Sequence, residues 1–302
     1  MKTPKGLSRQ EFEMKFGSNY QCMKYLSDLK WGNGFRCRIC NSDTARKGKK
    51  SDFKRCNSCG YEESPTSHTL FHKTKFDLYK AFGMIYDILT SKKGASTTWL
   101  SERYEVSQNT AWLFKRKVQS YLSSSKNHLL SGIVHVDEFE IGTPKEGEQG
   151  RSATESKSRV VMAVEILGNG KVGNAYARVI EDFSTKSLKT IFLDHINPDA
   201  NIVTDGWRGY APLKRLYKKL TQELSNAGKN FPEIHIQIRN VKNWLRGTHS
   251  FCESKNLQDY LDEYFFRFNR RNHRETIVEN AIERRFVWFK APTYREIITL
   301  AT

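Results

Sequence analysis

Four cysteines in two CxxC pairs place the firmest constraint on how this chain can fold. Cys37 and Cys40 form the first pair, Cys56 and Cys59 form the second, and 15 residues separate the pairs. Two such pairs supply four thiolates, the ligand set of a tetrahedral structural zinc ion. Gly60 follows the second pair and suits the tight turn that brings the thiolates together. A thioredoxin-like redox site needs only one CxxC pair, so the sequence predicts a closed zinc site that stabilises the fold.

The rest of the sequence favours an intracellular protein. Cys22 and Cys252 stand outside the two pairs, and we expect them to be small core residues. The lysine-rich start has no apolar stretch behind it, so it does not resemble a secretion signal. No apolar run approaches the ~20 residues that a membrane helix needs. We therefore expect a cytoplasmic protein that has access to DNA and no membrane partner.

The charge of the chain indicates a polyanionic partner. Lysine and arginine number 50 against 33 aspartates and glutamates, which gives a net charge of +17. The excess is concentrated in residues 1–60, around the cysteine pairs, where phosphate contacts are expected. A basic face that is merely solvated, or that binds protein, is the alternative. Aromatic residues make up 12% of the chain, which excludes a disordered protein.

Changes in composition divide the chain into four predicted segments. Residues 1–30 are predicted to be a helical lead-in, because large apolar residues recur there at helical intervals. Residues 31–68 are rich in turn-forming residues and contain the predicted zinc ribbon. Residues 69–128 are predicted to be helical, and an α/β domain is predicted at 129–302.

The third of these segments contains a candidate helix-turn-helix. Ser107 is predicted to cap a helix that begins at Gln108 and carries Lys115, Arg116 and Lys117. A helix, a short turn and a basic helix are typical of DNA-binding proteins, so these three basic residues are expected DNA contacts. An ordinary pair of packed helices is the alternative.

The fourth segment alternates between strand and helix patterns, which predicts a mixed sheet. A long polar connection, 142–158, follows the first strand, and both a DNA-covering loop and a solvated loop fit its composition. The predicted strands are 133–141, 160–167, 175–180 and 202–204, and the predicted helices are 184–195, 235–246 and 255–271.

Two aspartates in this segment are candidate metal ligands. Asp137 lies inside an apolar strand, where a charge is costly unless it meets a cation. Asp205 follows the short strand 202–204 and precedes Gly206. Carboxylates on neighbouring strand ends can share two divalent ions about 3.5–4 Å apart, which activate the attacking oxygen and stabilise the leaving oxygen in phosphoryl transfer. A salt-bridged Asp137 and a helix-capping Asp205 are the alternatives, and Glu138 is predicted to point to the opposite face of the sheet.

Four stretches of the sequence together resemble a known family, the insertion-sequence transposases of the DDE class that carry an N-terminal zinc ribbon (the ISXO-like group). The resemblance covers most of the chain, from about Trp31 to Arg271. It implies that the predicted α/β domain, 129–302, is an RNase H-like catalytic domain. It further implies divalent-metal catalysis with Mg²⁺ or Mn²⁺, recognition of terminal inverted repeats, and association with the nucleoid of a prokaryotic cell. It also implies strand cleavage and strand transfer, by a homodimer or larger assembly when DNA is bound. The four stretches are 135–138 (His-Val-Asp-Glu), 204–210, 243–249 and 260–271.

The resemblance also implies a third catalytic position. In that family it lies on a helix seven residues before a lysine, which here gives His235 and Lys242. The family tolerates histidine there, so Asp137, Asp205 and His235 form the implied metal site. Lys242 is the implied phosphate contact. Glu233 and Glu263 are rival candidates for the third position.

The same predicted helix carries further basic residues. Positions i and i+7 of a helix share a face, so Arg239 lies on the same side as His235 and Lys242. Arg239, Lys242 and Arg246 are the expected DNA contacts of this helix.

Three other functions remain open on sequence grounds. A zinc-ribbon regulator would bind DNA without catalysis, and a metal-dependent nuclease of the same fold would cut without joining. An inactive copy of the element's protein is the third, because histidine departs from the usual acidic triad.

Overall fold

The computed structural model describes residues 7–50, 52–123, 128–142, 157–224, 226, 230–249, 253–289 and 292–299, in two compact units. The first unit comprises residues 1–121 and 272–300, and the second comprises residues 122–271. The segment 272–300 was predicted as part of the α/β domain. It packs with the first unit instead, because Ile282 and Phe286 are fully buried there and Leu70 donates its N–H to the Phe286 carbonyl. Most of the predicted connection 142–158 lies outside the described residues.

The first unit has an aromatic core beneath three helices, α1 (Arg9–Phe16), α2 (Asn19–Trp31) and α3 (Leu78–Thr90). Phe16 packs against Phe12 and Phe82, with ring centroids 5.2 and 5.1 Å apart. Ser8 caps α1 by accepting the Glu11 N–H, while the Glu11 carboxylate accepts the Ser8 N–H in return. Helical segments from the end of the chain also belong to this unit: α9 (Ile277–Ala281), η3 (Ile282–Phe286) and α10 (Tyr294–Thr299).

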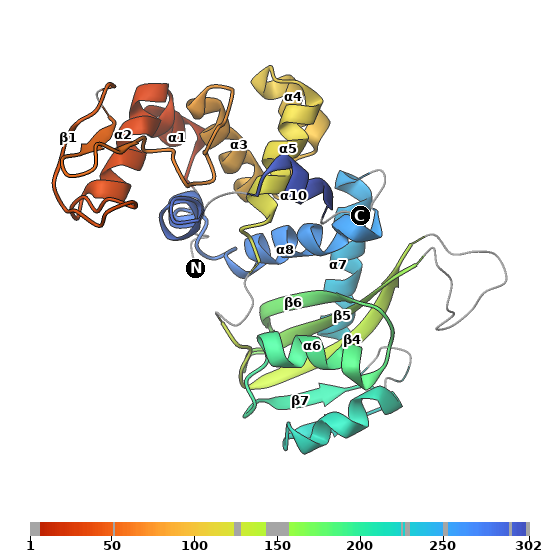
Figure 1. Cartoon of the computed structure of the whole chain (residues 1–302). Coiled ribbons are helices and arrows are strands. Elements are labelled where there is room, and N and C mark those ends of the chain that lie inside the picture. The colour runs from red at the N-terminus through yellow and green to blue at the C-terminus, as the bar shows by residue number, and fades with distance from the viewer. Residues whose placement is uncertain are drawn as a thin grey trace. The chain divides into compact units, whose positions relative to one another are not determined.

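A three-stranded antiparallel ribbon follows α2 in the same unit (Figure 1). Its strands are β1 (Ala45–Lys47), β2 (Lys54–Cys56) and β3 (Glu62–Glu63). The ribbon is joined to α2 by an ion pair of 2.6 Å between Lys30 and Glu63, whose side chains are almost wholly buried. Lys30 also donates to the carbonyls of Ser64 and Ser67. This buried ammonium therefore anchors the ribbon to the helical core.

Two short helices, α4 (Thr97–Tyr104) and α5 (Gln108–Gln119), pack against each other across a three-residue turn. Glu105 in this turn adopts the left-handed conformation with φ 51°. The Ser107 side chain accepts the Thr110 N–H, which confirms the predicted cap. The segment therefore has the form of a helix-turn-helix.

The second unit has a five-stranded mixed sheet with the order β6-β5-β4-β7-β8. The first three strands along the chain, β4, β5 and β6, are antiparallel neighbours, whereas β7 and β8 add in parallel on the other side of β4. This order and these directions give the RNase H-like fold that was expected. The strands are β4 (Ile133–Ile141), β5 (Ser158–Ile166), β6 (Val172–Ile180), β7 (Asn201–Thr204) and β8 (Leu220–Gln222).

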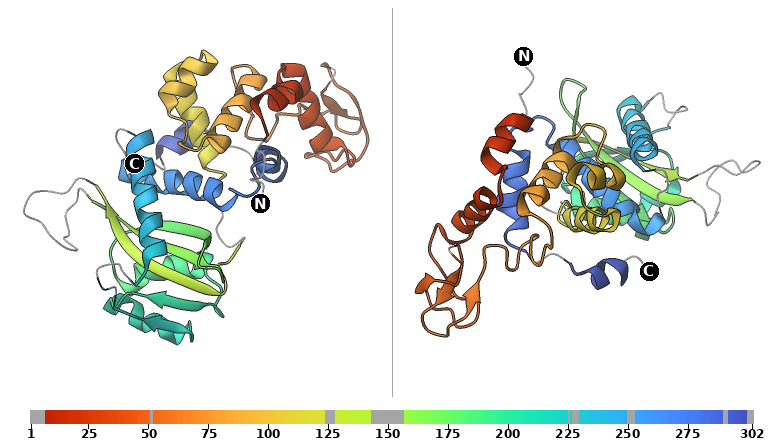
Figure 2. Two further views of the ribbon diagram at one scale, coloured as in Figure 1. Left: turned by 180° about the vertical axis from the view of Figure 1, so that it is seen from behind. Right: turned by 90° about the horizontal axis from the view of Figure 1, so that it is seen from above.

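Helices cover both faces of this sheet (Figures 1 and 2). One core lies under α6 (Thr185–His195) and the 3-10 helix η1 (Arg208–Arg215), and it includes Val134 and Val136 of β4. The other lies under α7 (Pro232–Thr248) and α8 (Ser254–Asn269), and it includes Phe139. Alternate residues of β4 therefore enter different cores, as the pleat of a strand requires.

The unpaired cysteines and the helix lengths can be compared with the sequence-based expectations. Cys22 is fully buried, as predicted, whereas Cys252 lies outside the described residues. Among the helices of the described residues, none combines the length and the apolar character that a membrane crossing requires.

Candidate functional site

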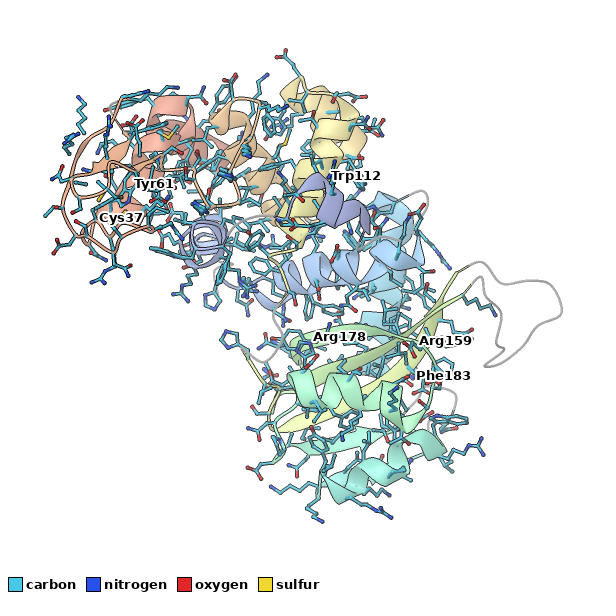
Figure 3. The ribbon with its side chains drawn as sticks, viewed as in Figure 1. Cys37, Tyr61, Trp112, Arg159, Arg178 and Phe183 are labelled. Atoms are coloured by element: carbon cyan, nitrogen blue, oxygen red, sulfur yellow. The ribbon has the colours of Figure 1, made fainter. Side chains whose placement is uncertain are left out.

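The four paired cysteines meet at one point of the ribbon (Figure 3, where Cys37 is labelled). Their sulfur atoms all lie within 4.8 Å of one another, with Cys37 and Cys59 3.6 Å apart and Cys40 and Cys56 3.5 Å apart. Four sulfurs around a tetrahedral zinc ion at 2.3 Å would lie roughly 3.8 Å from one another. Gly60 follows the second pair with φ +71°, which is the left-handed turn that was expected of it. The donor set and its spacing fit zinc.

The pKa values of the thiols in this cluster also favour a bound cation. Backbone N–H groups of Cys59 and Ser58 help to lower the pKa of Cys56 to about 6, so this thiol ionises readily. The pKa of Cys40 is raised to about 12, because burial and the neighbouring thiols outweigh the hydrogen bond from the Ser42 backbone. Further negative charges are therefore unfavourable at this spacing until a positive ion compensates them.

The second cluster gathers carboxylates at the edge where β4 passes the end of β7. Oxygen atoms of Asp137, Glu138 and Asp205 lie within 4.8 Å of one another. The Glu138 N–H donates to Asp137 Oδ1 at 2.9 Å, and the Trp207 N–H donates to Asp205 Oδ1 at 3.0 Å. These backbone bonds orient Asp137 in the middle of β4 and Asp205 just after the end of β7. Three carboxylate oxygens at this spacing are the donor type that a hard divalent cation prefers.

Glu138 was predicted to point to the opposite face of the sheet from Asp137, and this direction is confirmed, but its carboxylate nevertheless joins the group that could hold a metal. The two side chains do leave opposite faces of β4, since Glu138 accepts a hydrogen bond of 2.5 Å from Tyr210, which belongs to the core under α6. The parallel ladder between β4 and β7, however, ends at the pair Val136 and Thr204. Beyond it β7 no longer separates the two faces, so both carboxylates reach Asp205 around the same edge.

Tyr210 is the buried partner of this cluster. Its side chain is completely buried, and burial together with the Glu138 charge raises the pKa of the phenol well above its usual value. The phenol therefore stays protonated and remains a hydrogen-bond donor to the carboxylate.

His235 lies beside the acidic cluster, on α7. Its Nδ1 is 3.7 Å from Asp137 Oδ2, and its side chain is 39% exposed. Burial lowers the pKa of the imidazole, so the neutral form prevails at pH 7. The structure thus brings Asp137 and Asp205 together and places His235 beside Asp137, although His235 is not part of the group of side chains that could hold a metal.

The two rival carboxylates lie elsewhere. Glu233 sits in the first turn of α7, 4.0 Å from His135, and does not belong to the three-carboxylate group. Glu263 is fully buried on α8, where its carboxylate lies 3.5 Å from Arg267. Neither position brings a carboxylate into the group that could hold a metal.

Basic residues of α7 follow His235 along the helix. The Lys242 ammonium lies 5.3 Å from the centre of the Phe139 ring, and burial with the nearby Arg246 charge lowers its pKa. Arg239 and Arg246 are exposed. These three residues therefore remain candidates for phosphate contacts.

The basic residues of α5 do not have the arrangement that was expected. Lys115 is only 2% exposed, and its ammonium donates to the Ala95 carbonyl at 2.7 Å. Arg116 is also buried and donates to Gln119, while burial lowers the pKa of the half-buried Lys117. The predicted DNA contacts through Lys115 and Arg116 are contradicted, because these side chains hold the helical unit together.

Comparison with known proteins gives matches to both parts of the chain. The model of the transposase zinc-ribbon domain matches residues 17–62, and the model of the ISXO2-like transposase domain matches residues 129–269. No curated protein matches the chain. Among solved structures, the crystal structure of the mariner Mos1 paired end complex with Mg matches at 12% identity and a TM-score of 0.24. That match covers 67% of this chain and 77% of the other.

The two matched domains occur in the order that the resemblance implied, and together they span more than half of the chain. Each coincides with one of the two ligand clusters, the four cysteines in the first and the three carboxylates in the second. The chain therefore belongs to the transposase family that joins a zinc ribbon to an ISXO2-like transposase domain.

Proposed function

We propose that this transposase binds the terminal inverted repeats of its insertion sequence, cuts a DNA strand at each end and joins the freed ends to target DNA. The observation that carries the proposal is the meeting of Asp137, Glu138 and Asp205 at one edge of an RNase H-like sheet. Mg²⁺ or Mn²⁺, as two ions, would activate the attacking oxygen and stabilise the leaving oxygen there. His235, 3.7 Å from Asp137, completes the surroundings of the reacting phosphate.

The proposed reaction has two transfers at phosphorus. In the first, a water oxygen bonds to phosphorus while the bond to the 3′-oxygen breaks, which leaves a 3′-hydroxyl and a 5′-phosphate. In the second, that 3′-hydroxyl bonds to a phosphorus of target DNA while the target's own 3′-oxygen leaves. The backbone N–H groups of Glu138 and Trp207 hold the aspartates in place throughout. Lys242, Arg239 and Arg246 are proposed to bind the DNA phosphates.

The first unit is proposed to hold the terminal DNA. Its ribbon carries exposed basic residues, and the first turn of α5 presents Gln108 and Asn109 to solvent. Amide side chains at the start of a recognition helix can pair with adenine in the major groove. Because Lys115 and Arg116 are buried, base contacts would come from this first turn. Two ends must meet before joining, so we propose a homodimer or larger assembly on DNA.

The test is strand cleavage and joining on labelled terminal-repeat duplexes, with and without Mg²⁺ or Mn²⁺. The variants Asp137→Asn, Asp205→Asn and Glu138→Gln remove charge from the cluster while keeping side-chain size. Asp199→Asn is the matched control, since Asp199 is an exposed carboxylate of the same unit outside the cluster. DNA binding is measured in parallel by fluorescence anisotropy.

We expect metal-dependent joining by the wild type and the control, and loss of joining with binding retained in the Asp137 and Asp205 variants. Cleavage without joining would favour a nuclease of the same fold. Binding without cleavage by any form would point to a regulator or an inactive copy, and the proposal would be wrong.

A further inference from the structure

Two aromatic residues are linked to Asp205 by hydrogen bonds, and their side chains have no part in the chemistry described above. Trp207 follows Asp205 by two residues, and Phe183 lies just before α6. Both rings pack against the core under α6 while remaining partly exposed. The exposed part of each ring is an apolar surface that a ligand can cover beside the proposed phosphoryl-transfer site.

The indole of Trp207 is fixed relative to Asp205. The Trp207 N–H donates to the Asp205 carboxylate at 3.0 Å, and the indole N–H donates to the Phe183 carbonyl at 2.9 Å. Gln222 Nε2 donates to the carbonyls of Trp207 and Asp205, at 2.9 and 3.2 Å. The ring and the carboxylate therefore belong to one hydrogen-bonded turn and have a set orientation.

The absence of a side chain at Gly209 leaves the space that the indole of Trp207 occupies. A Cβ atom at this position would lie 2.7 Å from Trp207 Nε1 and 2.8 Å from the Phe183 carbonyl oxygen, closer than real Cβ atoms approach. The Gly209 carbonyl in turn accepts a hydrogen bond of 2.8 Å from Thr185. The backbone at Gly209 is thus shaped around the ring.

Guanidinium groups accompany both rings. Arg159 lies 5.9 Å from the centre of the Phe183 ring and donates to the Glu181 carbonyl, and Figure 3 shows Arg159 beside Phe183. The exposed Arg208 lies 5.5 Å from the centre of the Trp207 ring. Aromatic rings interleaved with arginines are typical of surfaces that stack bases and bind the backbone of single-stranded DNA. Next to a cluster of carboxylates, which repels phosphate, these cations also favour the approach of DNA.

We propose that Trp207 and Phe183, with Arg159 and Arg208, form a subsite for a nucleobase unstacked from the DNA strand beside the phosphate that is cut. This inference rests on the proposed function. It adds to it a second subsite, next to the metal site, whose ligand is a nucleobase. A base that leaves the DNA double helix loses its stacking partners. The indole, already fixed by its hydrogen bonds, can replace one of them without a loss of side-chain entropy. Every base has a π-face, so this subsite would accept any base and would position the strand rather than read it.

The experiment is a double-mutant cycle between protein and DNA, in Ca²⁺ to prevent cleavage. Fluorescence anisotropy gives the Kd for an intact terminal-repeat duplex. It also gives the Kd for a series of duplexes that each carry a single abasic position, placed on one side or the other of the cleavage point. Trp207→Leu keeps an apolar side chain over Gly209 but removes the π-face, and Trp207→Phe keeps an aromatic ring. Both variants lose the indole N–H, so the difference between their Kd values isolates the contribution of base stacking. Trp288→Leu is the matched control, because Trp288 is 50% exposed and belongs to the other unit.

We expect Trp207→Leu to bind intact duplex roughly tenfold more weakly than wild type, with Trp207→Phe and Trp288→Leu within about threefold. On DNA lacking one particular base beside the cleavage point, wild type and Trp207→Leu should bind alike. Equal binding of intact DNA by wild type and Trp207→Leu would overturn the subsite, as would a deficit that persists on every abasic duplex. Cleavage by the wild type in Mg²⁺ is measured separately. If the protein binds DNA with the expected pattern of Kd values but does not cut it, the proposed function is refuted and the base-binding subsite is still supported.

Discussion

The phenol of Tyr210 donates a hydrogen bond of 2.5 Å to Glu138 Oε2, from a position that is completely buried. This bond joins the core under α6 to the acidic cluster and fixes one of its three carboxylates. The phenol keeps its proton because burial raises its pKa well above 10. A buried group thereby sets the position of a carboxylate at the candidate metal site, a role that resembles outer-shell support of metal ligands.

Tyr210→Phe tests this support. The substitution keeps the ring in the core and removes the donor, so we expect the half-saturating Mg²⁺ concentration for strand cleavage to rise about tenfold with the fold unchanged. Tyr217→Phe is the control, since Tyr217 is buried in the same core. An unaltered metal dependence in Tyr210→Phe would show that this hydrogen bond does not support metal binding by the acidic cluster.

The sequence predicted those parts of the site that depend on local pattern. Asp137 lies in an alternating apolar strand and Asp205 ends a short one, so their elements were recognisable, and the strand directions brought both to one edge. The place of Glu138 depended on where the ladder between β4 and β7 stops, at Val136 and Thr204. That is a property of two segments far apart in the chain. The three-residue β8 was missed for the same reason, because only its pairing with β7 identifies it.

The basic residues of α5 show another limit of sequence patterns. A lysine on a predicted DNA-binding helix indicates a phosphate contact unless its ammonium finds a partner inside the protein. Lys115 finds the Ala95 carbonyl, which belongs to the turn before α4 and is not visible in the helical pattern of α5. A long side chain with an apolar stem can thus be buried in a core, even though its charge alone would predict that it is exposed.

Lys115→Met should therefore affect stability and not DNA affinity. The change leaves the Ala95 carbonyl without its charged donor, and we expect the first unit to lose about 1–3 kcal/mol of unfolding free energy. Chemical denaturation measures this loss, and anisotropy on terminal-repeat DNA should give an unchanged Kd below the unfolding transition. Weakened DNA binding with unaltered stability would restore the original expectation of a phosphate contact.

The first turn of α5 is the alternative source of DNA contacts. Gln108 and Asn109 are exposed, and Ser107 fixes the helix start by accepting the Thr110 N–H. The double change Gln108→Ala and Asn109→Ala should weaken binding to terminal-repeat DNA by about 1–3 kcal/mol per lost base contact. Binding to a scrambled duplex should change little, because phosphate contacts remain. Equal losses on both duplexes would exclude base recognition by this turn.

Removal of zinc should affect the ribbon and spare the sheet. Cys40→Ser replaces one of four thiolates, so we expect the bound zinc to be lost and the ribbon 31–68 to become sensitive to proteases. Zinc is measured by elemental mass spectrometry and cleavage by limited proteolysis. Cys22→Ala is the matched control, since Cys22 is fully buried outside the cluster and its variant should keep zinc. A ribbon that stays protease-resistant without zinc would show that the metal is not needed for its fold.

The stability of the second unit should fall in mild acid because of His195. This residue is 5% exposed and its ring stacks on Tyr176 with centroids 4.1 Å apart. Burial and the Arg178 charge together lower its pKa to about 4, although the Asp194 charge partly opposes them. The folded pKa thus lies below that of the unfolded chain, near 6.5, so the unfolded state takes up the proton first as pH falls. The contribution to stability is complete above about pH 6.5 and is lost as pH falls towards 4.

Between pH 7 and pH 5 this linkage should lower the unfolding free energy by about 2 kcal/mol. His195→Phe keeps a flat ring against Tyr176 and removes the titrating group, so urea unfolding of this variant should show a pH dependence weaker by that amount. All other titrating groups contribute equally to both proteins, and the difference between the two therefore isolates His195. Identical pH dependence in wild type and variant would mean that His195 is protonated in the folded state at pH 5, against the burial that the structure gives it.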